Sequence, residues 1–298
     1  MLVDLIQVTA SDGVRLHGTL ETPPDDAPSD PTVDVWLCVH GTGSNFYSAS
    51  TIGGLAPKLL ATGAAVLRVN TRGHDLMSSG PSTFGGGLQG AAFERIDEAP
   101  LDLRAWIDLL HERGYRRVGL LGHSMGAIKV ILLLAGGDPP PIAALAALSP
   151  PRLSYSHFCA SDRADEFLET FARATESVQA GRRNELMLIR FPLLYYVSAD
   201  GFVDRYGPEE KYNVLRMLDR VPCPTLVTYG SSEMQSAVAF TGMSDAVEEL
   251  AAQPTANSLQ VAVIAGADHL YTGCHDVLAA RITRWAGRLE RRADESAN

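Results

Sequence analysis

The sequence has no long apolar run. No window of its 298 residues approaches the roughly 18 consecutive apolar residues that a membrane-spanning helix needs. It also lacks an excess of basic residues, since 25 Lys and Arg stand against 35 Asp and Glu, a net charge of −10. Nucleic-acid binding needs clustered cations, so this balance argues against a broad surface of that kind. The first ten residues contain Asp4 and no basic region, so we expect no signal peptide.

Cysteine is scarce and follows no pattern. The four cysteines, Cys38, Cys159, Cys223 and Cys274, form no CxxC pair. The sequence also has no HExxH motif, and no GxGxxG follows a predicted strand. We therefore expect reduced thiols in a cytoplasmic protein that uses no metal and no other cofactor.

Apolar residues make up 46% of the chain and charged residues 20%, which is typical of a globular protein with a sizeable core and excludes disorder as its overall state. Eight short apolar runs are predicted to be strands because of their length and composition. They span residues 2–9, 14–21, 33–39, 64–69, 117–121, 143–148, 225–229 and 259–264.

Helical patterns separate most of these runs. They cover residues 53–62, 95–113, 127–135, about 244–251 and 275–291. Pro100 lies inside the second, so that helix either kinks there or begins its regular part there. Alternation of strands with helices predicts a mostly parallel sheet with helices on both faces.

One stretch breaks this alternation. Residues 151–220 contain 10 of the 21 aromatic residues and are rich in charge. Ligand sites in open α/β sheets lie at the C-terminal edge of the strands, so we interpret this stretch as a helical cap over that edge. The core would then comprise residues 1–150 and 221–298. The alternative is a peripheral helical layer. Gly85-Gly86-Gly87 is predicted to be a loop near the site entrance.

The strongest motif is Gly122-His123-Ser124-Met125-Gly126, which follows a predicted strand and opens a helix. This is the context of a nucleophile elbow, in which a sharp turn exposes the Ser hydroxyl and the glycines avoid steric clashes. A chance tight turn is the alternative. The motif predicts that Ser124 is a nucleophile.

A second motif, His40-Gly41-Thr42-Gly43-Ser44, follows the strand at 33–39. Backbone N–H groups there can stabilise the oxyanion of an acyl-transfer intermediate. We expect the donors to be the N–H groups of Thr42 and Met125, with His40 in a structural role.

A general base is expected late in the chain, and Ala265-Gly266-Ala267-Asp268-His269 follows the last strand. His269 is therefore the predicted base. Its orienting acid should precede it, and Glu233 is the first carboxylate after the strand at 225–229. Asp245 is the rival, and Asp268 is too close to His269 in the chain for a hydrogen bond of the right direction.

Four segments, GHSMG, HGTGSN, NTRGHD and GADH, resemble the α/β-hydrolase superfamily, and the order of elements matches over essentially the whole chain. FERIDEAPLDLRAWIDLL and GFVDRYGPEEKYNVLRML resemble a serine hydrolase group that includes siderophore-esterase-like and serine-aminopeptidase-like proteins. The resemblance implies an α/β-hydrolase fold with an eight-stranded sheet and a cap. It also assigns nucleophile, acid and base to Ser124, Glu233 and His269, although Asp is the commoner acid in the superfamily.

These features predict a cofactor-independent serine hydrolase that cleaves an ester, thioester or amide through an acyl-enzyme. An acyltransferase or cyclase with the same triad is one alternative, and a ligand-binding protein without catalysis is another. The aromatic cap suggests a small-molecule substrate with an apolar portion. Its candidate contacts are His123, His157, Tyr195, Tyr196 and Phe202.

Overall fold

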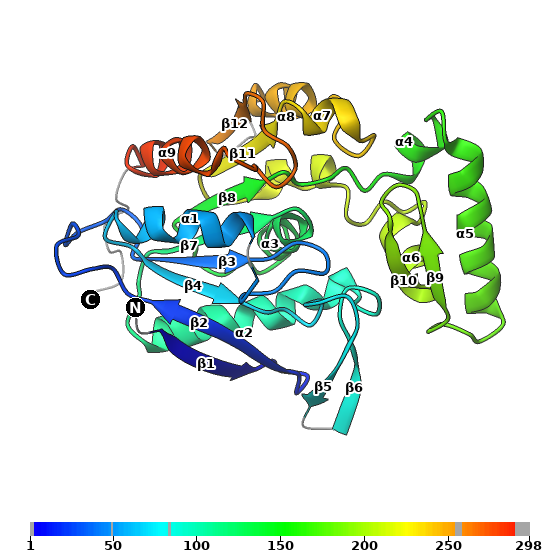
Figure 1. Ribbon diagram of the computed structural model, residues 1–298, viewed down its shortest axis with the longest axis horizontal. Helices are drawn as coiled ribbons and strands as arrows, with labels where there is room; N and C mark the ends of the chain where they lie inside the picture. The colour runs from blue at the N-terminus through cyan, green and yellow to red at the C-terminus, as the bar shows by residue number, and fades with distance from the viewer. Residues whose placement is uncertain (1–2, 49, 83–84, 254–257, 290–298) are drawn as a thin grey trace.

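The computed structural model describes residues 3–48, 50–82, 85–253 and 258–289, and its centre is an eight-stranded sheet (Figure 1). The strands are β1 Asp4–Thr9, β2 Arg15–Glu21, β3 Val35–Val39, β4 Ala65–Val69, β7 Val118–His123, β8 Ala144–Leu148, β11 Thr225–Gly230 and β12 Leu259–Ile264. Their order is β1-β2-β4-β3-β7-β8-β11-β12. β2 is antiparallel to both neighbours, and all pairs from β4 to β12 are parallel. The predicted mostly parallel sheet is confirmed.

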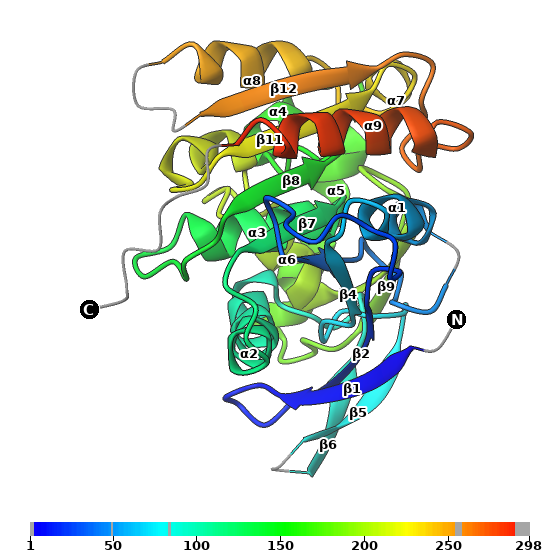
Figure 2. The same ribbon diagram turned by 90° about the vertical axis from the view of Figure 1, so that its left-hand side faces the viewer.

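Two helical layers cover the sheet, one on each face (Figure 2). One layer contains α2 Ala99–Glu112, α3 Met125–Leu134 and α8 Met243–Ala251, and the other contains α1 Thr51–Leu60 and α9 His275–Ala286. Strand β3 contributes side chains to the hydrophobic cores on both faces of the sheet, because alternate side chains point to opposite faces. Leu37 packs in the core beneath α2 and α3, whereas Trp36 and Cys38 pack beneath α1 and α9. This double burial explains why the central strands are almost continuously apolar.

Pro100 marks the start of a helix and causes no kink. A short 3₁₀ turn, η1 Ile96–Glu98, precedes α2, so Pro100 is the second residue of the α-helix. The first N–H groups of a helix have no partner within it, and a proline there loses no hydrogen bond. From this point Leu103, Trp106 and Leu110 are fully buried at helical spacing.

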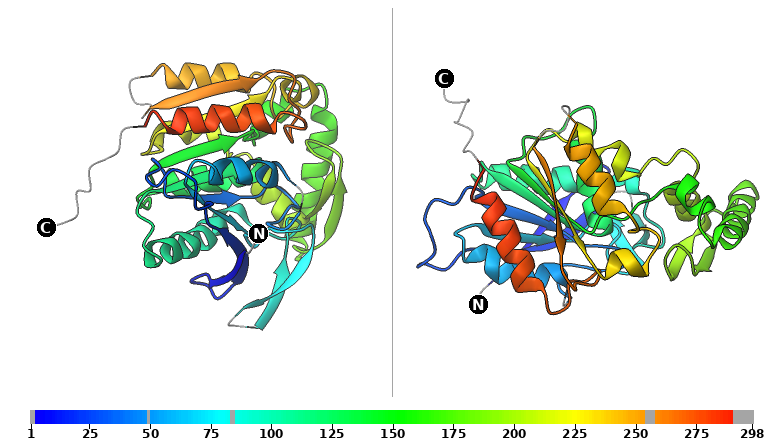
Figure 3. Two further views of the ribbon diagram at one scale, coloured as in Figure 1. Left: turned by 60° about the vertical axis from the view of Figure 1, so that its left-hand side comes forward. Right: turned by 90° about the horizontal axis from the view of Figure 1, so that it is seen from above.

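Residues 151–220, which we call the insertion, connect β8 to β11. They form α4 Tyr155–Cys159, α5 Ala164–Gln179, β9 Leu186–Ile189, β10 Tyr195–Ser198, α6 Ala199–Tyr206, η2 Val214–Arg216 and η3 Leu218–Arg220. Figures 1 and 3 show α4, α5, α6 and the β9–β10 hairpin together at one end of the molecule, beyond the end toward which β3, β7 and β8 point. The hairpin was not expected in a helical segment.

Local burial explains this hairpin. Met187 and Ile189 are buried, whereas Leu186 and Leu188 on the same strand are exposed. This period of two suits a strand with one covered face.

The prediction for Gly85-Gly86-Gly87 was wrong. These glycines begin β6 Gly85–Gln89, which pairs with β5 Ser78–Ser82 in an antiparallel hairpin at the side of the molecule near β1 and β2 (Figure 2). Gly85 has a φ of 111°, a backbone conformation that favours glycine. None of the three glycines lines the pocket described below.

Within the described residues, no helix is long and apolar enough to cross a membrane. The four cysteines are free thiols. The remaining helix of the described chain, α7 Glu233–Ser236, is a single short turn after β11.

Glu210 anchors the two ends of the insertion to each other. Its carboxylate accepts hydrogen bonds from the Ser154 hydroxyl at 2.9 Å, the Ser156 backbone N–H at 2.8 Å and the Asn213 amide at 2.9 Å. Burial opposes ionisation of Glu210, but the hydrogen bonds from Ser156, Asn213 and Ser154 outweigh it and lower the pKa to about 2. The charged form is therefore favoured by folding.

We expect Glu210→Gln to destabilise the protein at pH 7 and hardly at pH 2. Because the native pKa lies below the unfolded value, the stabilisation is complete above about pH 5 and is lost as the pH falls toward 2. At about 1.4 kcal/mol per pKa unit, the loss at pH 7 would be up to about 3 kcal/mol. Urea unfolding of both proteins at several pH values tests this. An equal loss at every pH would contradict it.

Candidate active site

Ser124 occupies a strained turn between β7 and α3. Its φ of 56° and ψ of −121° lie in a region that a non-glycine residue rarely adopts, at a cost of roughly 1–3 kcal/mol. The glycines two positions away make the turn feasible. A Cβ on Gly126 would lie 2.3 Å from the Val39 carbonyl oxygen, and one on Gly122 would lie 2.5 Å from the Gly126 carbonyl oxygen. The side chains of both positions are thus excluded by backbone atoms.

We expect Gly126→Ala to damage both the turn and the site. The new methyl group would push α3 away from the end of β3, and backbone atoms there cannot move aside cheaply. The expected results are a loss of a few kcal/mol in unfolding free energy and at least about a hundredfold lower turnover. The matched control is Gly137→Ala, since a Cβ there meets no atom within 4 Å. Equal stability and turnover of the two variants would contradict the steric argument.

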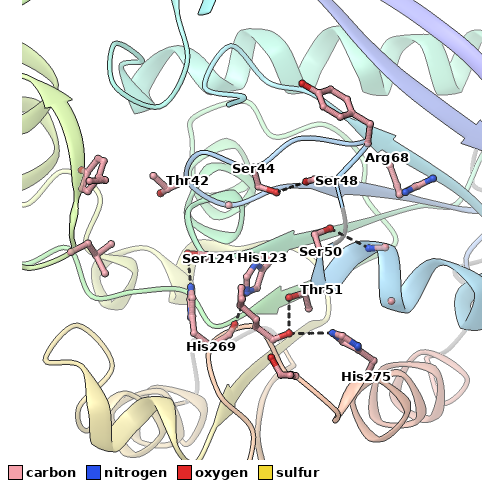
Figure 4. Close-up of a pocket in the computed structure, with 18 of the residues that line it drawn as sticks. Thr42, Ser44, Ser48, Ser50, Thr51, Arg68, His123, Ser124, His269 and His275 are labelled. Carbon is pink, nitrogen blue, oxygen red and sulfur yellow. Dashed lines mark hydrogen bonds between the residues drawn. The ribbon is translucent and has the colours of Figure 1, made fainter. Parts of the chain in front are cut away.

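His269 meets Ser124 across the carboxyl ends of the strands. It lies in the loop between β12 and α9, and its Nε2 is 3.0 Å from Ser124 Oγ (Figure 4). The ring of Phe240 packs against it, with 4.8 Å between ring centroids. The imidazole is therefore held by packing as well as by hydrogen bonds.

Glu233 lies on the far side of His269 from the serine. Its Oε2 is 2.8 Å from His269 Nδ1, and its Oε1 accepts a hydrogen bond from the Gly230 N–H at 2.6 Å. The carboxylate is buried. Because Glu233 begins α7 three residues after β11 ends, its longer side chain folds back toward the strand. This placement lets a glutamate reach the imidazole.

A polar group of three further residues supports Glu233, and sequence reasoning missed all of them. The Ser149 hydroxyl donates to Glu233 Oε1 at 2.5 Å, and the Tyr271 hydroxyl lies 2.8 Å from Ser149 Oγ and 2.7 Å from Thr228 Oγ1. Burial raises the pKa of Tyr271. The signal available in the sequence was position, because Ser149 directly follows β8 and Tyr271 is two residues after His269.

The two rival acids have other partners. Asp245 lies in the first turn of α8, where it accepts a hydrogen bond from the Ser244 hydroxyl at 3.1 Å. Asp268 accepts from the backbone N–H groups of Leu270 and Thr272 and so shapes the loop that carries His269. Of the three carboxylates, the one hydrogen-bonded to the His269 ring is Glu233.

His123 joins the elbow to the histidine loop. Its Nε2 donates to the backbone carbonyl of His269 at 2.8 Å, and the two rings are 4.9 Å apart. Burial, with a smaller contribution from His269, lowers the pKa of His123 to about 3. The ring is therefore neutral near pH 7 and keeps the proton that this hydrogen bond needs.

A pocket of about 900 Å³ opens beside Ser124 (Figure 4). Apolar surface comes from Leu193 and Leu194 of the insertion and from Leu270. The polar lining side chains largely have partners within the protein. Examples are the Thr51 hydroxyl, which donates to the Leu270 carbonyl, and Arg68, which pairs with Glu21 at 2.6 Å.

The candidate substrate contacts lie in different places. His123 and Tyr195 line the pocket. Phe202 is fully buried among aromatic rings of the insertion, and Tyr196 is on the exposed face of the β9–β10 hairpin. His157 bonds to the Val238 carbonyl and does not line the pocket. These three residues were placed near the substrate because the sequence did not show which face each would present.

The two candidate oxyanion donors come from the loop after β3 and from the start of α3. Thr42 lies in the loop after β3 and lines the pocket together with Ser124. Met125 is the first residue of α3, and the first N–H groups of a helix lack intrahelical acceptors. In the described part of the chain, no group of three or more His, Cys, Asp or Glu side chains could hold a metal ion.

Comparison with known proteins agrees with this architecture. Est1E from Butyrivibrio proteoclasticus, solved with ferulic acid bound, has a TM-score of 0.63 and 16% identity, with 94% of this chain and 97% of that chain covered. The Pyrococcus furiosus esterase Pf2001 has a TM-score of 0.62 and 19% identity over 97% and 91% of the two chains. The α/β hydrolase GrgF from Penicillium sp. sh18 has a TM-score of 0.68 and 14% identity over 97% and 99%.

No curated protein matches the chain in sequence. The model of the alpha/beta hydrolase family matches residues 36–281, most of the chain from β3 to α9. Together with the order of the strands and the turn at Ser124, this match identifies the fold. The chain belongs to the alpha/beta hydrolase family.

Proposed function

We propose that this protein is a serine hydrolase that cleaves a carboxylic ester, thioester or amide through an acyl-enzyme. Ser124 Oγ attacks the carbonyl carbon while His269 Nε2 takes its proton, and His269 then donates that proton to the leaving group. Water, activated by the same imidazole, cleaves the acyl-enzyme. Acylation breaks the bond to the leaving group, and deacylation releases the carboxylic acid and restores Ser124 and neutral His269, so water is the only co-substrate.

Glu233 and two backbone groups complete the proposed machinery. Glu233 keeps the His269 proton on Nδ1 and stabilises the imidazolium that forms after proton transfer. The N–H groups of Thr42 and Met125 would receive the oxyanion of the tetrahedral intermediate. A positive helix end lies at Met125, which also favours negative charge there.

The observation that carries this proposal is the continuous hydrogen-bonded chain from Ser124 Oγ to His269 at 3.0 Å and from His269 to Glu233 at 2.8 Å. The Pyrococcus furiosus esterase Pf2001 is only 19% identical, so its likeness supports the fold and leaves ester cleavage as part of the proposal.

We also propose that the insertion acts as a cap and that the substrate has an apolar portion. Leu193, Leu194 and Tyr195 form one wall of the pocket. The polar groups on the opposite wall already have hydrogen-bond partners, so an apolar ligand would leave few of them unsatisfied.

Rapid mixing with p-nitrophenyl esters of increasing acyl length tests the proposal. We expect a burst of p-nitrophenol close to one per chain, followed by slower turnover, and kcat/KM that rises with chain length. Added alcohols or amines would be acylated in place of water if the protein is a transferase. A folded protein that releases no p-nitrophenol from any ester would overturn the proposal.

A further inference from the structure

Three charged side chains are buried behind the nucleophile and take no part in the proposed chemistry. Glu94, Lys129 and Arg205 are each at most 3% exposed. Lys129 Nζ lies 2.6 Å from Glu94 Oε2, and Arg205 Nη2 lies 3.4 Å from Glu94 Oε1. Apolar residues of similar volume often stabilise a core as well as buried ion pairs do, so stability alone does not account for this arrangement.

Contacts lead from Lys129 to the loop after β3. Lys129 Nζ donates to Thr71 Oγ1 at 2.8 Å, and the Thr71 backbone N–H donates to His40 Nε2 at 3.2 Å. His40 therefore carries its proton on Nδ1, which donates to the Gly41 carbonyl at 2.8 Å. Burial and the charge of Lys129 lower the pKa of His40 to about 3, so the ring stays neutral in this tautomer.

The chain of contacts ends on the peptide that carries the Thr42 N–H. The Gly41 carbonyl and the Thr42 N–H belong to one planar trans peptide unit and point in opposite directions. The Gly41 carbonyl accepts from His40 Nδ1 and, at 3.2 Å, from the Ser44 N–H, and holding this carbonyl fixes the direction of the Thr42 N–H. This peptide is packed against the nucleophile, since a Cβ on Gly41 would lie 3.0 Å from Ser124 Cβ.

The Glu94 carboxylate is also linked to the insertion, through Arg205. Arg205, on α6, donates to the Tyr195 hydroxyl at 3.0 Å, and Tyr195 lines the pocket. Arg205 also donates to the backbone carbonyl of Ala91, next to the Glu94 segment. Glu94 is thus linked through Arg205 to the pocket wall that the insertion forms, and through Lys129 to the loop after β3.

We propose that Lys129, held by Glu94, is a positioning residue for the oxyanion hole, and that Arg205 couples the insertion to Lys129 through Glu94. The proposal rests on the proposed acyl chemistry, because it concerns the Thr42 N–H that stabilises the oxyanion. It predicts that losing the ammonium group impairs transition-state binding more than substrate binding.

The test compares Lys129→Met with wild type in ester turnover and in inhibition by a trifluoromethyl ketone, whose adduct with Ser124 is a tetrahedral oxyanion. The matching methyl ketone reports ground-state binding. We expect kcat to fall about 10- to 100-fold with KM within about twofold. Affinity for the trifluoromethyl ketone should fall by the same factor and affinity for the methyl ketone should be unchanged.

Two further variants keep the test decisive. Lys58→Met, which removes an exposed lysine paired with Asp276, is the matched control and should behave as wild type. Thr71→Val breaks the link from Lys129 without deleting a charge, and it should lower kcat and trifluoromethyl ketone affinity together. This variant carries the test if Lys129→Met does not fold.

The outcomes separate this proposal from the proposed function. Folded Lys129→Met or Thr71→Val with wild-type kcat and ketone selectivity would overturn the positioning role, even if its melting temperature were lower. A wild-type protein with no ester turnover and no time-dependent inhibition would instead overturn the acyl chemistry, and the positioning role would fall with it.

Discussion

Ser124→Ala is expected to lower kcat for ester hydrolysis by about 10⁴-fold or more and to leave KM nearly unchanged. The hydroxyl is the proposed nucleophile, so the variant would retain only the catalysis that the proposed oxyanion donors and substrate binding supply. Folding should be unaffected, because alanine is slightly smaller than serine and fits the same turn. Steady-state kinetics and thermal unfolding measure both.

The control is Ser161→Ala, which removes a serine hydroxyl that donates to the Phe158 carbonyl in the insertion, away from the pocket lining. It should retain full turnover. If Ser124→Ala kept more than about a tenth of wild-type kcat, nucleophilic attack by Ser124 would be wrong.

Glu233→Gln is expected to lower kcat by about 10³- to 10⁴-fold with little change in overall fold. The amide keeps the size of the carboxylate, but its NH₂ group must face either His269 Nδ1 or the donors Gly230 N–H and Ser149 Oγ–H. Each choice either places two donors together or selects the wrong imidazole tautomer. The pH–rate profile and kcat are the measurements.

Asp245→Asn is the matched comparison, because Asp245 was the rival acid in the sequence. Its side chain pairs with Ser244 in α8, so we expect wild-type turnover. A large loss in Asp245→Asn together with normal turnover in Glu233→Gln would contradict the assignment of the acid.

The sheet could be predicted from the sequence because its central strands, β3, β7 and β8, are buried on both faces. A run such as Val35–Val39, apolar at every position, needs no tertiary information to be placed in the centre of a parallel sheet. The elbow was equally predictable, since Gly122 and Gly126 are dictated by backbone atoms close by in the fold. These constraints leave a direct mark on residue type, because only apolar residues or glycine satisfy them.

Features that depend on distant contacts could not be predicted. The β9–β10 hairpin is short, and the alternation of Leu186 to Ile189 is too brief to outweigh the charged, helix-like segments around it. Phe202 and His157 belong to a segment whose aromatic rings largely pack on one another, so aromatic content alone did not identify pocket residues.

The residues that hold the candidate site residues in place could not be predicted from the sequence either. Ser149 reaches Glu233 from the end of β8, and Tyr271 contacts Ser149 from the loop between β12 and α9. Lys129 lies on a helix that is apolar nearly all round. A single lysine in such a helix gives no sign of its partner, because Glu94 is 35 positions away and becomes a neighbour only in the fold.

The most direct test of the central claim is mass spectrometry after treatment with a fluorophosphonate. We predict one phosphonyl group per chain, located on the peptide that contains Ser124, with none added to Ser124→Ala or after acid unfolding. A folded wild-type protein that stays unmodified, or that carries the adduct on another serine, would contradict it.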